Sequence, residues 1–64
     1  MSLTVGEVLE NAKFNRKNAV MQFQINLAKE QEKNYRKAKE LGASDEDDWY
    51  EWAEKIKQSE NKIG

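Results

Sequence analysis

Carboxylates are concentrated in one short stretch, SDEDDWYE from Ser44 to Glu51, whose residue types could bind a cation. Carboxylate oxygens bind Ca²⁺ and Mg²⁺, but a calcium loop alternates its ligands around a glycine-bearing turn and closes with Glu. The stretch lacks that spacing. Acidic side chains also stabilise the first turn of a helix, where the helix dipole is positive. We therefore expect the start of a helix here and no metal site.

Most other residue types that carry protein chemistry are missing. The chain of 64 residues contains no His and no Cys, which excludes imidazole catalysis, thiolate zinc sites and disulfides. It has three Gly, and none belongs to a Gly-rich phosphate loop. We expect a protein that is not an enzyme and that has no catalytic residue, cofactor or metal.

Size and composition predict a single folded domain over residues 1–64. A chain of this length buries only about 60% of its unfolded surface, so small domains commonly need a disulfide, a metal or a partner chain. The start, MSLTVGEVL, lacks the pattern of a signal peptide, and no apolar run reaches membrane-spanning length. We expect a cytoplasmic protein without a membrane partner. The net charge of −1 divides into +3 over residues 1–43 and −4 over residues 44–64.

Two sets of signals mark a long helix followed by a shorter one. Thr4 and Glu7 form a capping-box pattern, so the first helix should begin near Val5. There is no Pro in the chain and no Gly between Gly6 and Gly42, so this helix should run over about 5–41 and end at a glycine cap. Ser44 begins a second capping pattern, which predicts an antiparallel second helix over about 45–62.

The apolar residues of the first helix fall on two sides. Val5 and most later apolar residues keep one helical phase up to Leu41, whereas Phe14, Met21 and Ile25 lie opposite them. A segment that is apolar on two sides needs two neighbours. We expect a hairpin core of Leu27, Leu41, Trp49, Trp52 and Ile56, and a homodimeric, coiled-coil-like bundle whose interface contains Phe14, Val20, Met21, Phe23 and Ile25.

The segment NRKN, Asn15 to Asn18, is the weakest helical stretch of the first helix. If the chain kinks or turns there, the hairpin becomes a three-helix bundle.

The segment VMQFQINL also alternates like a strand. This segment is followed by a helix that ends at Leu41-Gly42 and then by a second helix that bears Trp49 and Trp52. The order of strand, helix and helix resembles the ribbon-helix-helix repressors. The resemblance implies a strand over 20–26 that pairs with its copy in a second chain and enters the major groove of DNA. It also implies that Gln22, Gln24 and Asn26 read base edges.

The sequence thus favours an all-α protein that binds another macromolecule. We expect a small protein–protein interaction module that acts as a homodimer, as bacterial or phage regulators and inhibitors do, or as a structural subunit. No residue identifies the protein partner, and a DNA-binding repressor is the alternative.

Overall fold

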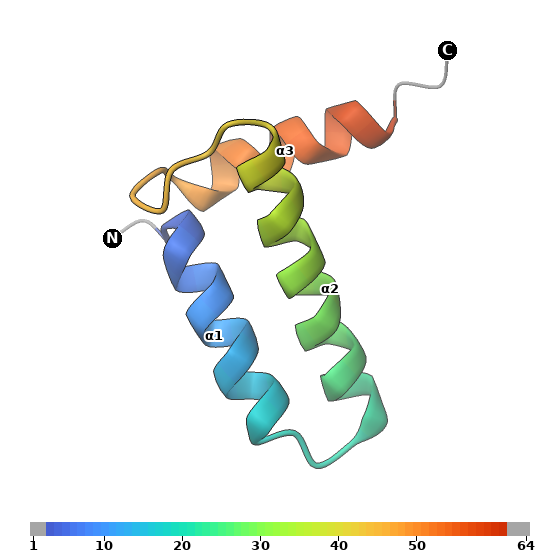
Figure 1. Cartoon of the computed structure of the whole chain (residues 1–64). Coiled ribbons are helices and arrows are strands. Elements are labelled where there is room, and N and C mark those ends of the chain that lie inside the picture. Colours follow the sequence, from blue (N-terminus) through green and yellow to red (C-terminus); the bar gives the residue numbers. More distant parts are fainter. Residues whose placement is uncertain (1–2, 62–64) are drawn as a thin grey trace.

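The computed structural model describes residues 3–61 and, within that range, contains three helices and no strand (Figure 1). The helices are α1 (Val5–Lys17), α2 (Gln22–Glu40) and α3 (Trp49–Glu60). α1 and α2 lie side by side and antiparallel, and α3 crosses the end of the pair that holds the start of α1 and the end of α2. The prediction of an all-α chain is confirmed.

The predicted continuous helix over 5–41 is wrong, because a turn over residues 18–21 separates α1 from α2. The buried side chains explain the turn. α1 buries Val5, Val8 and Ala12, whereas α2 buries Ala28 and Ala38. On one straight helix Ala28 would lie roughly 140° from Val5, at about 100° per residue. Only a turn allows both sets to face each other, so three helices are found, as in the three-helix alternative. The turn lies later than the predicted break at Asn15–Asn18, because residues 15–17 belong to α1.

The side chains of Asn18 and Gln24 satisfy backbone groups at this turn. The Asn18 amide and its side-chain Nδ2 both donate to the Phe14 carbonyl, at 3.0 and 2.8 Å. The Gln24 Oε1 atom accepts from the backbone amides of Val20 and Met21, at 2.9 and 3.0 Å. The turn therefore needs neither Gly nor Pro, the residues by which turns are usually recognised in a sequence.

The strand expected over 20–26 does not form, since residues 22–26 are the first turns of α2. Gln22 Nε2 donates to Asn26 Oδ1 at 3.2 Å, an i to i+4 contact along the helix, while Gln24 caps the turn. The three amides therefore do not form the reading face of a β-ribbon.

A second connection, over residues 41–48, leads from α2 to α3. Gly42 has a φ of 109°, and the amides of Gly42 and Ala43 donate to the carbonyls of Lys39 and Ala38 at 3.1 and 2.9 Å. These two bonds form a Schellman motif, which confirms the predicted glycine cap.

The third helix begins four residues later than predicted. Asp48 is its N-cap and accepts from the Glu51 amide at 3.2 Å. Asp47 Oδ2 instead accepts from the Ser44 amide at 2.9 Å, so residues 44–47 form a turn outside the helix. The predicted end at residue 62 lies outside the described residues.

The segments that precede α1 and α3 pair through their backbones. The Trp49 amide donates to the Leu3 carbonyl at 2.8 Å, and the Val5 amide donates to the Asp47 carbonyl at 2.9 Å. An isolated antiparallel bridge between Thr4 and Asp48 lies between these bonds. The predicted capping box is also present: Glu7 Oε1 accepts from the Thr4 amide, and Thr4 Oγ1 accepts from the Glu7 amide. The start of α1 is therefore fixed to the start of α3.

The main hydrophobic cluster lies at this end of the molecule. Its buried members are Val5, Val8, Ala38, Ala43, Trp49 and Ile56. Trp52 packs against the cluster and donates through Nε1 to Asp47 Oδ2 at 3.0 Å. Leu27 and Leu41, expected in the hairpin core, are instead 62% and 49% exposed. α3 crosses the pair rather than running along it, so it does not reach Leu27.

Candidate interaction surface at the open end of the hairpin

An uncharged groove runs between α1 and α2 at the end of the pair farthest from α3, which we call the open end. The groove has a volume of about 500 Å³. Both helices and the turn contribute to its lining, which consists of Ala12, Asn15, Asn18, Ala19, Phe23, Gln24, Leu27, Ala28 and Gln31. None of these nine side chains is charged, although 36% of the chain is Asp, Glu, Lys or Arg. Depletion of charge is typical of the centre of protein–protein interfaces.

Small residues form the base of the groove, and large ones stand beside it. Ala12 and Ala28 are 2% and 3% exposed. Phe23 and Leu27, which are neighbours at i and i+4 on α2, are 56% and 62% exposed. The groove thus offers a shallow depression with alanines at its base and two apolar projections, and its remaining lining consists of the amide side chains of Asn15, Asn18, Gln24 and Gln31.

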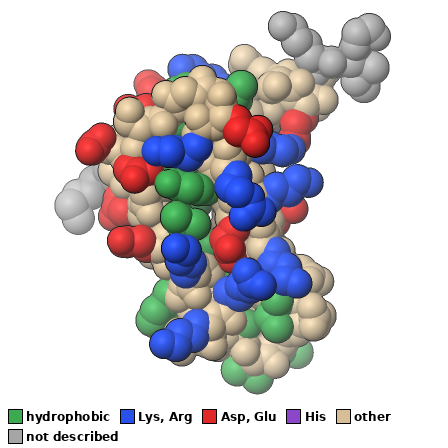
Figure 2. Space-filling model, in the orientation of Figure 1, with side chains coloured by type: hydrophobic (Ala, Val, Ile, Leu, Met, Phe, Trp, Pro, Cys, Tyr) green, Lys and Arg blue, Asp and Glu red, His purple; other side chains and the backbone are tan. Residues whose placement is uncertain are grey.

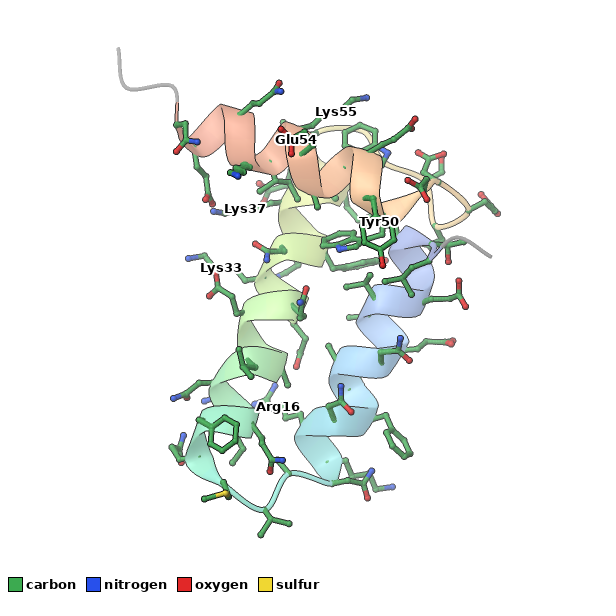
Figure 3. All side chains as sticks on the ribbon, turned by 180° about the vertical axis from the view of Figure 1, so that it is seen from behind. Arg16, Lys33, Lys37, Tyr50, Glu54 and Lys55 are labelled. Carbon is green, nitrogen blue, oxygen red and sulfur yellow. The ribbon has the colours of Figure 1, made fainter. Side chains whose placement is uncertain are left out.

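α3 lies over one face of the α1–α2 pair, near one end, and the groove lies on the same face near the other end. Asn34, two helical turns after Leu27, lines a smaller hollow together with Trp49 and Ala53 of α3. Figure 3, which views the molecule from this side, shows α3 across one end of the pair, with Arg16 near the other end. α3 therefore covers only part of this face, and the uncharged groove is a part that remains uncovered.

The residues predicted for a dimer interface are not brought together as one surface. Phe23 lines the groove, whereas Phe14, Val20 and Met21 are 67%, 91% and 57% exposed outside its lining. Ile25 is only partly exposed. Among the residues predicted for the hairpin core, Leu27 lines the groove, Trp49 and Ile56 of α3 are buried, and Trp52 of α3 is partly buried.

The small residues of the groove were absent from the predicted interface. Ala12, Ala19 and Ala28 do not by themselves indicate an interface, because alanine has the highest helix propensity and suits buried and exposed helix positions alike. A usable signal was the uncharged run from Asn18 to Ala28, which is unusual in a chain this rich in charge.

The cations of the open end lie mainly away from the groove. Arg16 of α1 forms an ion pair with Glu32 of α2 at 3.3 Å, and neither residue lines the groove. Lys13 lies one helical turn before Arg16 and lines a hollow beside Tyr35 on the face turned away from α3. Figure 2 views that face and shows Lys and Arg side chains over both helices. The pair thus has an uncharged face and a cationic face at its open end.

The acidic stretch after α2 has a structural role at the other end. Asp45 Oδ1 accepts from Tyr35 Oη at 3.0 Å and from Lys39 Nζ at 3.2 Å. The bond from Lys39, and then that from Tyr35, lowers the pKa of Asp45, while the bond to Asp45 raises the pKa of both Tyr35 and Lys39. The Ser44 amide and the Trp52 indole lower the pKa of Asp47. These carboxylates hold the connection to α3 in place.

Within residues 3–61, no group of three or more Asp or Glu side chains is arranged to hold a metal ion. No helix in that range is both long and apolar enough to cross a bilayer. Comparison with known protein families, curated proteins and solved structures finds no match for this chain.

Proposed function

We propose that this protein is a non-enzymatic protein–protein interaction module that forms a homodimer through the groove at its open end. The observation that carries the proposal is the uncharged lining of the groove, with Phe23 and Leu27 exposed beside a base of buried alanines. Exposed apolar surface gathered in one place on a small domain is typical of an interaction site.

A second copy fits the groove because the groove presents both projections and a depression. Under two-fold symmetry the same patch is used by both chains, so Phe23 and Leu27 of one copy would enter the alanine-lined depression of the other. Charge does not oppose this pairing, since the groove lining contains no Lys, Arg, Asp or Glu.

Dimerisation also supplies what the chain lacks by itself. The main hydrophobic cluster lies at the α3 end, and no disulfide is possible in a chain without Cys. Covering the groove would give the open end a core of its own. In this proposal the dimer acts in the cytoplasm as a regulator, an inhibitor or a structural subunit toward another protein.

The experiment compares two single substitutions by sedimentation velocity. Leu27→Gln places a polar group in the groove, whereas Tyr50→Gln changes a side chain of α3 that is 67% exposed and outside the groove. We expect Leu27→Gln to raise the dimer dissociation constant at least about tenfold, the effect of losing a central interface residue. Tyr50→Gln should leave the constant unchanged. Equal constants for the two variants would contradict the proposal.

A further inference from the structure

The turn between α1 and α2 exposes apolar side chains that the proposed dimer groove does not use. Val20 is 91% exposed and Met21 is 57% exposed at the tip of the turn. Phe14, one helical turn before Asn18, is 67% exposed. None of the three lines the groove. Polar residues normally occupy such a tip, because the loops of a folded chain meet water.

Cations without carboxylates surround this tip. Between Glu10 and Glu30 the sequence contains no Asp or Glu, and it contains Lys13, Arg16, Lys17 and Lys29. Lys17 directly precedes the turn. Lys13 lies about 7 Å from the turn along α1, and Lys29 about 12 Å beyond Met21 along α2, at 1.5 Å per residue. Arg16 forms an ion pair with Glu32, whereas no ion pair within residues 3–61 involves the three lysines.

Most of the acidic residues lie at the opposite end of the molecule. Asp45, Glu46, Asp47 and Asp48 form the connection to α3, and Glu51 and Glu54 belong to α3 itself. Figure 3 shows Glu54 on α3 and Arg16 near the turn, at the two ends of the α1–α2 pair. The protein is therefore a charge dipole whose positive end carries the exposed apolar tip.

We propose that the turn over residues 18–21 docks on the surface of an anionic lipid bilayer. Val20, Met21 and Phe14 enter the boundary between headgroups and acyl chains, and the three lysines remain among the headgroups. The acidic end then points away from the negative surface, so the dipole fixes the orientation of the protein. This inference goes beyond the proposed dimer, stands on different residues, and replaces the expectation that the chain has no membrane partner.

A bilayer explains both features of the tip, whereas a nucleic acid explains only one. Phosphates of a nucleic acid in water would bind the lysines, but they offer no apolar phase for Val20 and Met21. A bilayer surface supplies negative charge and an apolar interior within one short distance, and peripheral proteins commonly combine a hydrophobic element with basic residues.

The first test is co-sedimentation of the full chain with vesicles at low ionic strength. We expect binding to vesicles of phosphatidylglycerol and phosphatidylcholine, weaker binding in higher salt, and little binding to phosphatidylcholine alone. Lys13→Gln and Lys17→Gln should each weaken binding about fivefold. The double variant Val20→Ser/Met21→Ser should weaken it at least about tenfold, while Tyr50→Ser, at the other end, should leave it unchanged. Circular dichroism checks that each variant is folded.

A second measurement locates the tip. The chain has no Cys, so Val20→Cys and Tyr50→Cys each provide one site for a polarity-sensitive fluorophore. Emission from position 20 should rise and shift to the blue on anionic vesicles, and emission from position 50 should not. The proposal is overturned if the chain does not bind these vesicles, or if it binds them while position 20 remains in water. The chain is also tested with polyphosphate. Binding as tight as that to vesicles, and unchanged in Val20→Ser/Met21→Ser, would show attraction to any polyanion and would likewise overturn the proposal. The dimer constant, measured without lipid, tests the proposed function separately.

Discussion

The amide nitrogen of Gly6 lies 3.0 Å from the carbonyl oxygen of Asp45, so the first turn of α1 is capped by the backbone of the loop that leads into α3. The first amides of a helix have no partner within the helix. Here the loop carbonyls of Asp45 and Asp47 accept from Gly6 and Val5. This contact, between residues nearly forty positions apart, fixes the third helix on the first two.

Gly6→Ala should destabilise the fold, although alanine is the better helix former. A Cβ atom at residue 6 would lie 3.1 Å from Asp45 Cβ and 3.3 Å from the Asp45 carbonyl oxygen, and backbone hydrogen bonds hold that loop in place. We expect a net loss of about 1 kcal/mol, because overpacking costs about 1–3 kcal/mol and helix propensity returns up to about 1 kcal/mol. Urea unfolding measures the change. Asn11→Ala, at an exposed position of α1, is the control and should stabilise slightly.

Gly42→Ala should destabilise the chain for a different reason. Nothing lies within 4 Å of an added Cβ at this position, but φ is 109°, a conformation that L side chains rarely adopt. The expected loss is about 1–2 kcal/mol. Gly42→Asn should lose less, since Asn tolerates left-handed backbone better than Ala does. If thermal unfolding ranks Asn below Ala, strain at the glycine cap is not the cause.

Acid should weaken the attachment of α3 through Asp45 and Asp47. Hydrogen bonds lower the pKa of both carboxyl groups from 3.8. A lowered pKa in the folded state contributes stability that is present above the unfolded value and is lost as the pH falls through the folded value. The free energy of unfolding should therefore decrease below about pH 4. Asp47→Asn should have a lower free energy of unfolding than the parent chain at pH 7, and the difference between the two free energies should become smaller toward pH 2.5. Glu54→Gln, which removes an exposed carboxyl of α3 that accepts no side-chain hydrogen bond within residues 3–61, is the control.

Gln22→Pro should leave the three-helix fold intact. Gln22 is the first residue of α2, where proline is well tolerated, and Met21 before it is extended with φ −114° and ψ 150°. We expect a change within about 0.5 kcal/mol and unchanged circular dichroism. In a continuous helix over 5–41 the same proline would cost about 3 kcal/mol. Gln31→Pro, in the middle of α2, should be strongly destabilising and serves as the positive control.

The start of α1, the end of α2 and the helical class of this chain could be predicted from local residue chemistry. The Thr4–Glu7 capping box and the cap at Gly42 involve residues close together in sequence, and both are present. Such motifs satisfy the backbone amides and carbonyls that every helix end leaves free, so they carry the same meaning in any fold.

The turn over residues 18–21 could not be predicted in the same way. It contains no Gly or Pro, and the side chains that bond the backbone there are those of Asn18 and Gln24. The weak helix propensity around Asn18 indicated a possible break, but Gln24 is a good helix former and gives no sign of a turn. The apolar periodicity also gives no sign of the turn, because Phe23 and Leu27 fall on the same side of a continuous helix as Val5. In the fold these two side chains are exposed, and the small Ala28 makes the contact instead. Periodicity records which side chains are apolar and not which helix will cover them.

Sedimentation equilibrium of the unmodified chain over a wide concentration range tests the central claim, self-association through the groove, most directly. The chain mass is 7.5 kDa. We predict that the weight-average mass rises with concentration to a plateau at twice that value, and that the rise moves to higher concentration in Leu27→Gln. A mass that stays at 7.5 kDa to the highest concentration measured would contradict the account.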